Sequence, residues 1–176
     1  MLAASALAVA DALDGRFEVR SAFVNLHDDV YHLSADVQYP SNQQMRVALA
    51  DGVSLTFDLQ VRIARERRYW FDNTLFHLTQ RRRLEYHSVS DHYIVRDESN
   101  GTQRSFASFE AAIADLGKVE SWPILTRAQL GRAAAYRIAV RASVQRGRLN
   151  DALRTIFFWT NDWQRTSEWY EWSLPR

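Results

Sequence analysis

The stretch Val53–Ile63 (VSLTFDLQVRI) decides the fold class of this chain. Apolar residues fill its odd positions and polar residues its even positions, which is the two-residue period of a strand with one face in the core and the other in solvent. Val30–Tyr39 and Tyr136–Gln145 repeat this alternation. The sequence therefore predicts long half-buried strands, and such strands pair antiparallel.

Working outward, we predict further strands over Phe17–Leu26, Leu75–Val89, His92–Asp97 and Gln164–Leu174. Helical patterns are few: Phe106–Leu116, capped by Ser105, and the short Arg127–Leu130. Between them Trp122–Pro123 is interpreted as a break in the chain. The fold class that follows is mainly β: an antiparallel β-sandwich or partial barrel of seven to nine strands with one or two short helices.

Length and composition support one domain and exclude several functional classes. The chain has 176 residues, 22 Lys plus Arg, 21 Asp plus Glu, and no cysteine. The absence of cysteine excludes a disulfide framework, a thiol nucleophile and a cysteine-bound metal. Because the net charge is close to zero, a basic binding site could only be a local cluster of basic residues. No glycine-rich phosphate loop or strained serine elbow occurs, so we expect no catalytic residue and no cofactor.

The first twelve residues are alanine-rich and end in Ala8-Val9-Ala10 or Ala10-Asp11-Ala12. This small-x-small pattern is typical of a signal-peptidase site, so residues 1–12 are interpreted as a signal-peptide remnant and residues 13–176 as a single β-rich domain. A periplasmic location follows. The alternative is an alanine-rich N-terminus of a cytoplasmic protein. No apolar run approaches the roughly 20 residues of a membrane span, so any membrane contact would be peripheral.

An arginine-rich segment is the most unusual local feature. Between residues 60 and 87 seven arginines stand against three acidic residues. If Val53–Arg68 and Leu75–Val89 form a hairpin, the arginines lie on adjacent strands and gather near its tip. Such a site suits phosphate, an acidic glycan, anionic lipid or an acidic protein surface; the alternative is a solvated face that prevents aggregation. The predicted partner-binding residues are Arg65, Arg67, Arg68, Tyr69, Trp70, Arg81, Arg82 and Arg83.

Tryptophans concentrate at the C-terminal end. In a strand Trp169 and Tyr170 face opposite sides, so one face enters the core, and the face with Tyr170 and Trp172 is expected to stack on the arginine-rich strand or to meet a partner.

Two other functions remain open. Histidines and aspartates of His27–His32, or the histidines His77, His87 and His92, suggest a metal-dependent hydrolase, although the first set falls in a predicted turn. Arginines beside Tyr69 and Trp70 suggest RNA binding in the cytoplasm.

Several motifs spread along the chain are distinctive as a set. They are DGVxLxFxL at 51–59, RRYW at 67–70, LxYH at 84–87, HYxV at 92–95, RSFxSFEA at 104–111 and DWxxxSEWYxW at 162–172. In these the chain resembles the bacterial family known as domain of unknown function 4390, over nearly its whole length from Phe17. The resemblance implies an exported protein of Gram-negative bacteria without assigned catalytic residues, encoded near a membrane sensor kinase. The chain departs from the family pattern at residues 148–153.

These observations favour a non-enzymatic binding or accessory module for an envelope or sensor-kinase partner.

Overall fold

The computed structural model describes residues 13, 15–66, 73–130, 135–147 and 164–174. Within them ten strands form two antiparallel sheets, which confirms the predicted mainly β class with a slightly larger number of strands. The small sheet has the order β1-β2-β7, with β1 at Glu18–His27, β2 at Val30–Gln38 and β7 at Lys118–Thr126. The large sheet has the order β10-β8-β3-β4-β5-β6, and β9 also pairs with β8. Its strands are β3 Leu55–Arg65, β4 Asn73–His87, β5 His92–Asp97, β6 Gln103–Phe106, β8 Tyr136–Arg146, β9 Gln164–Thr166 and β10 Tyr170–Ser173.

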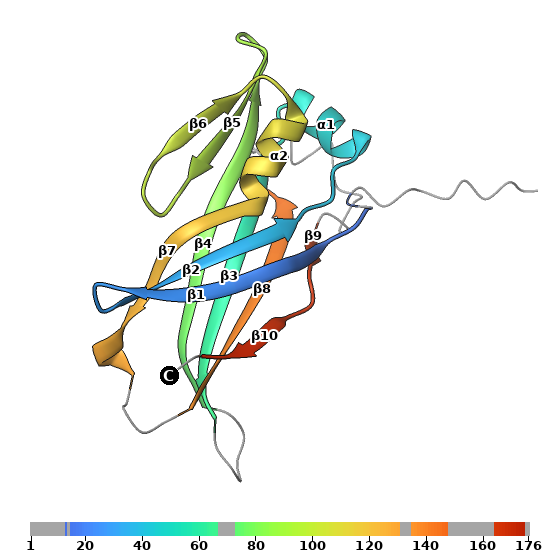
Figure 1. Ribbon diagram of the computed structural model, residues 1–176. Helices are drawn as coiled ribbons and strands as arrows, with labels where there is room; N and C mark the ends of the chain where they lie inside the picture. The colour runs from blue at the N-terminus through green and yellow to red at the C-terminus, as the bar shows by residue number, and fades with distance from the viewer. Residues whose placement is uncertain (1–12, 14, 67–72, 131–134, 148–163, 175–176) are drawn as a thin grey trace, which may run out of the picture.

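The small sheet crosses one face of the large sheet, and the core lies between them (Figure 1). The decisive strand β3 is central, because it pairs with β4 on one side and with β8 on the other along its whole length. Its odd-numbered side chains, from Leu55 to Ile63, are fully buried and meet apolar residues of β2 and β8. Phe57 packs edge-on against Tyr39, with ring centroids 4.9 Å apart. The alternation in the sequence thus marks the inner face of the large sheet.

The predicted opening hairpin is confirmed. β1 and β2 pair from Glu18 and Gln38 up to His27 and Val30. The two residues between them, Asp28 and Asp29, both have positive φ, the backbone of the tight hairpin turns that match strand twist.

The helices differ from the sequence-based expectation. Helix α2 covers Phe109–Gly117 and is capped by Ser108, whose side chain accepts from the Ala111 backbone N–H, rather than by Ser105. The predicted start at Phe106 is wrong because residues 103–106 pair with β5 as strand β6. Helix α1, Gln43–Ala50, was not predicted. The short helix is confirmed as a 3₁₀ turn, Arg127–Gln129, with a capping box at its start.

Two strand boundaries were also predicted wrongly. Trp122–Pro123 does not break the chain but lies inside β7, where Pro123 is tolerated because β7 is at the edge of the small sheet. The predicted strand Gln164–Leu174 is split into β9 and β10, which both pair with β8. Between them the Ser167 hydroxyl accepts from the Ala142 backbone N–H and so takes the place of a ladder bond.

No helix among the residues described here is both long and apolar enough to span a bilayer. Residues 1–12, with the predicted signal-peptide remnant, lie outside the described residues.

Candidate functional site

The register of the β3–β4 hairpin separates the arginines that the sequence suggested would cluster. Arg65 pairs with Asn73 at the turn end of the hairpin, whereas Arg81–Arg83 lie opposite residues 56–58 near the other end. The expectation that all of them gather near the tip is therefore wrong for Arg81–Arg83, because the strands are long and these residues come late in β4. Residues 67–70 lie outside the described residues.

Alternation along β4 then divides the arginine run between two faces. Arg81 and Arg83 point to the outer face, by which we mean the side of the large sheet turned away from the small sheet. Arg81 donates from Nε and Nη2 to the two carboxylate oxygens of Asp58, at 2.8 and 2.9 Å. This bidentate pair raises the pKa of Arg81, first through the hydrogen bond and then through the charge of Asp58. Arg83 forms an ion pair with Glu98.

Arg82 has the opposite role. Its side chain points inward, is 4% exposed, and donates to backbone carbonyls of Leu116 (2.6 Å), Lys118 (3.2 Å) and Asp115 (3.4 Å) at the end of α2. A helix leaves its last carbonyls without internal partners, and Arg82 supplies donors there beside the Lys118 N–H, which donates to the Asp115 carbonyl. Burial lowers the pKa of Arg82, and burial also raises the pKa of Tyr39 to about 12. Arg82 therefore links β4 to the end of α2. The prediction that it is a surface residue for binding a partner is wrong, because its side chain is buried.

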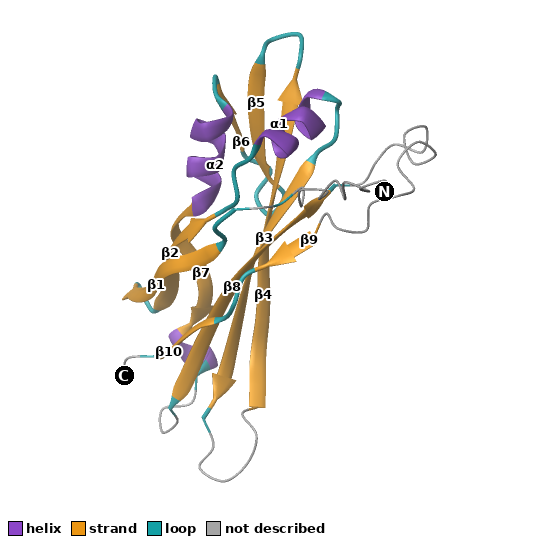
Figure 2. Cartoon of the chain, turned by 90° about the vertical axis from the view of Figure 1, so that its right-hand side faces the viewer, coloured by secondary structure: helices purple, strands orange, loops and turns teal. Residues whose placement is uncertain are grey.

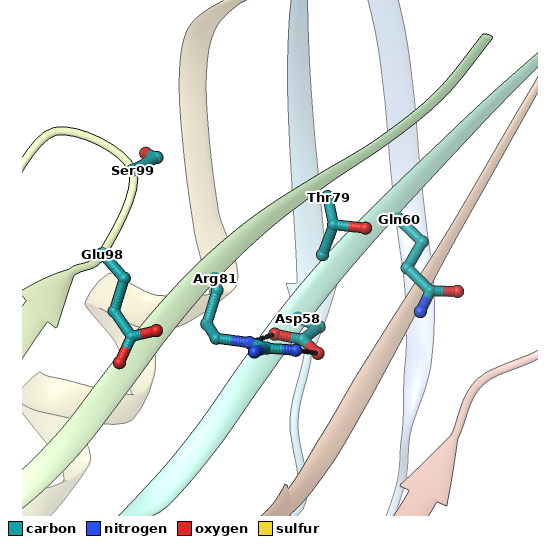
Figure 3. Close-up of a pocket in the computed structure, with 6 residues that line it drawn as sticks. All are labelled: Asp58, Gln60, Thr79, Arg81, Glu98 and Ser99. Atoms are coloured by element: carbon teal, nitrogen blue, oxygen red, sulfur yellow. Dashed lines mark hydrogen bonds and ion pairs between the residues drawn. The ribbon is translucent and has the colours of Figure 1, made fainter.

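A shallow depression of about 380 Å³ opens on the outer face (Figure 3). Asp58 and Gln60 of β3, Thr79 and Arg81 of β4, and Glu98 and Ser99 of the turn after β5 line it. Figure 3 shows the Arg81–Asp58 pair in its middle. All of the side chains that line the depression can donate or accept hydrogen bonds, so it suits a polar group rather than an apolar one.

The second feature of the outer face is a tryptophan that contacts two arginines. The guanidinium carbons of Arg62 and Arg141 lie 4.6 and 4.4 Å from the ring centroid of Trp169. Arg62 also binds Glu171 at 3.1 Å, and Arg141 donates to Gln60 at 2.7 Å. The guanidinium groups are thus held in place by stacking and by hydrogen bonds.

The sequence assigned this stacking to the wrong aromatic residues. Tyr170 and Trp172 contact each other edge-on at 5.8 Å and pack against the core, while Trp169 lies on the arginines. The register of β10 explains the exchange, because Tyr170 and Trp172 lie opposite the buried Val140 and Ile138 of β8, which leaves Trp169 on the outer face. The missed residue Arg141 carried a usable signal: its place on the polar face of a predicted strand.

The buried carboxylate of the depression is committed to an ion pair. Asp58, which is 6% exposed at its side chain, is already engaged by Arg81 at both oxygens. Both oxygens of this carboxylate therefore hold the guanidinium of Arg81 in a fixed orientation.

Of the histidines predicted as metal ligands, four come together in pairs. The rings of His27 and His32 have centroids 6.4 Å apart, and His87 pairs directly with His92 across β4 and β5. In the part of the chain that the structure describes, no group of three or more His, Asp or Glu side chains is arranged to hold a metal ion.

Asp115 is an unfavourably placed carboxylate at the end of α2. Its Oδ1 binds Arg104 of β6 at 2.8 Å, while its buried Oδ2 has no hydrogen-bond partner among the described residues. Burial raises the pKa of Asp115, although Arg104 and Arg82 act in the opposite direction and Glu120 adds to the rise. The helix end, with its carbonyl dipoles, also disfavours negative charge.

We expect Asp115 to make the protein more stable as the pH falls. Its raised pKa means that the folded state binds this proton more tightly than the unfolded state, so protonation below the raised pKa favours folding. The cost of the buried charge is fully present above that pKa. Asp115→Asn should remove this pH dependence, so urea unfolding should show the variant gaining stability relative to the natural chain as the pH rises above about 3.9, the usual pKa of an unfolded Asp. A constant difference would contradict the prediction.

Comparisons with known proteins identify one family. The model of a family described as a domain of unknown function (DUF4390) matches residues 14–173, nearly the whole chain. Neither the curated proteins nor the solved structures include a match to this sequence.

Proposed function

The chain belongs to the DUF4390 family, and on that premise we propose that it is a non-enzymatic binding module that holds a protein partner on the outer face of its large sheet. The observation that carries this proposal is the stacking of the Trp169 ring with the guanidinium groups of both Arg62 and Arg141. Tryptophan and arginine are among the residues most enriched at the positions that dominate binding energies in protein interfaces.

The electrostatics of the outer face support an interface with matched charges. Arg81 is paired with Asp58, Arg62 with Glu171, and Arg83 with Glu98, so positive and negative groups alternate across the strands. A partner that approaches such a face gains specificity from charges held in fixed positions. The depression beside Arg81 adds a place for one polar side chain of the partner.

The proposal extends to the place of action. The small-x-small pattern before Leu13 supports export, and we propose that the partner is an envelope protein or a sensor kinase. Arg65 and Arg81–Arg83 were suggested for this role by the sequence; Arg81 and Arg83 remain in the proposed surface and Arg82 leaves it.

Photo-crosslinking in the native host tests the proposed surface. A photoreactive amino acid replaces His77, which is exposed on the outer face opposite Arg62. We expect a protein adduct of defined mass, and we expect Trp169→Ala to reduce its yield at least tenfold because the arginines lose the ring that orients them. The fraction in which the adduct is found reports periplasm or cytoplasm.

Asn25 supplies the matched control, because it belongs to β1 of the small sheet, away from the outer face. The same photoreactive group at Asn25 should give no such adduct. Equal adducts from both positions, or an adduct with RNA from His77, would overturn the proposed function.

A further inference from the structure

Half of strand β4 has a neighbour on only one side. β4 pairs with β3 from Leu84 down to Asn73, but it pairs with β5 only from Arg82 to His87. No described strand lies on the β5 side of residues 73–81. Figure 2 shows this lower part of β4 as the outermost strand of the large sheet, with β3 on its other side. We call residues 76–81 the free edge.

The next feature is the direction of the backbone N–H and C=O groups along the free edge. The Glu98 N–H donates to the Arg81 carbonyl at 2.9 Å, so the groups of Arg81 are directed away from β3. Because these directions alternate along a strand, the N–H and C=O groups of Thr79 and His77 also point to the open side. The alternation ends near Leu75, where the register with β3 shifts. An unpaired edge of this kind is a template for another strand.

Most other sheet edges among the described residues carry protection that the free edge lacks, although β1 pairs regularly from Ser21 to His27. β6 and β10 have only four residues each. β7 contains Pro123 and two register shifts, and β1 has a register shift near its start. Short strands, proline and bulges are the usual protection against strand addition. The free edge has no proline, no lysine and no register shift.

Side chains along the free edge define what an added strand must present. On the inner side Phe76 and Leu78 are half-buried against the core, and on the outer side His77 and Thr79 are exposed. A strand added here would complete the cover of Phe76 and Leu78 with its own inward side chains. Its other side chains would lie beside Thr79 and Arg81, which line the depression.

We propose that the free edge binds an extended segment of the protein partner as an added antiparallel or parallel strand, apolar at inward positions and polar at outward ones. This rests on the proposed function and names how the partner is recognised. A second copy of the chain fits less well. If β4 of that copy paired antiparallel with the free edge, the β5 strand beside it would collide with the β3–β4 hairpin of the first copy near Thr74. A short segment avoids this collision, because it need only cover the free edge, which is bounded by Asp97 and Glu98 at one end and by Leu75 at the other.

Binding of a defined peptide library tests the strand addition. The probes are acetylated and amidated heptapeptides with Val, Leu or Phe at alternate positions and Ser, Thr or Glu between them, at concentrations up to about 1 mM. We expect binding by members of this library and at least tenfold weaker binding when the Thr79 N–H is removed by Thr79→Pro. Proline is accepted at edge positions whose N–H faces solvent, and Thr79→Val is the matched control that keeps the N–H.

Hydrogen exchange gives a readout that does not depend on the folding of the proline variant. In the natural chain, bound peptide should slow exchange of the His77 and Thr79 amides, while the Leu78 amide, which faces β3, should change little. Three results would overturn the strand addition: no binding up to the highest concentration, equal binding to Thr79→Pro and Thr79→Val, or a dimer of the chain that protects these amides without peptide.

The partner crosslink separates the two proposals. If Thr79→Pro leaves the adduct from His77 at full yield while Trp169→Ala removes it, the partner binds the outer face without adding a strand. If no adduct forms at all although library peptides protect His77 and Thr79, the edge binds strands and the proposed outer-face function is wrong.

Discussion

Replacing Arg82 by methionine is expected to lower the free energy of unfolding by about 3–5 kcal/mol, the largest effect we expect from a single substitution in this chain. Methionine keeps most of the length of the side chain but cannot donate hydrogen bonds. The backbone carbonyls of Leu116 and Lys118 would then lose the donor they share, whereas the Asp115 carbonyl keeps the Lys118 N–H. Each lost partner of a buried group costs about 1–3 kcal/mol.

Urea unfolding measures this loss, and two further variants define its origin. Arg96→Met makes the same chemical change on neighbouring β5, where the exposed arginine donates to the Gln103 side chain, so it should cost less than about 0.5 kcal/mol. Arg82→Lys keeps the charge without the planar fork and should fall between the two. An Arg82→Met protein as stable as the natural chain would contradict the prediction. It would show that the free energy of burying the guanidinium equals the free energy gained from its hydrogen bonds.

Gly117→Ala is expected to destabilise the protein by about 2–3 kcal/mol through a collision with a neighbouring backbone. A Cβ at this position would lie 2.4 Å from the Val37 carbonyl oxygen of β2. The close approach lets the end of α2 pack on the small sheet, and a carbonyl in a strand cannot move aside without breaking its ladder. In an open helix the same change would stabilise by about 0.5–1 kcal/mol, so a net loss identifies the contact.

Gly101→Ala provides the comparison for this prediction. Gly101 has φ +73° and open space where a Cβ would lie, so alanine there costs only the left-handed conformation, about 1 kcal/mol. Thermal unfolding should therefore rank Gly117→Ala below Gly101→Ala in stability. The opposite rank would mean that α2 and β2 can separate at little cost.

Strand content was predictable because its signal is local. The alternation over Val53–Ile63 reports directly which side chains of β3 are buried, and the structure buries those from Leu55 to Ile63. The hairpin at His27–Val30 and the capping box at Thr126 were likewise readable from neighbouring residues. Residues 103–106 were partly misassigned because the helical pattern that begins at Phe106 competes with pairing to β5.

The candidate site was only partly predictable, because it depends on register. The sequence indicated that arginines at 81–83 matter as a group, but a strand alternates its side chains, so consecutive arginines cannot share a face. Arg82 therefore became the inner anchor of α2, while Arg81 binds Asp58 on the outer face. Trp169 and Arg141 meet although they are distant in sequence, and no local pattern could pair them.

By itself, the sequence determined the mainly β class, the antiparallel pairing and the positions of the long strands, because the free energy of burying alternate apolar side chains depends on each strand's own residues. Only the tertiary structure decided which arginine is buried, which tryptophan stacks and which half of β4 remains an open edge. Those outcomes follow from how strands far apart in the chain are aligned, and a shift of one residue in that alignment would exchange the faces on which every one of these side chains lies.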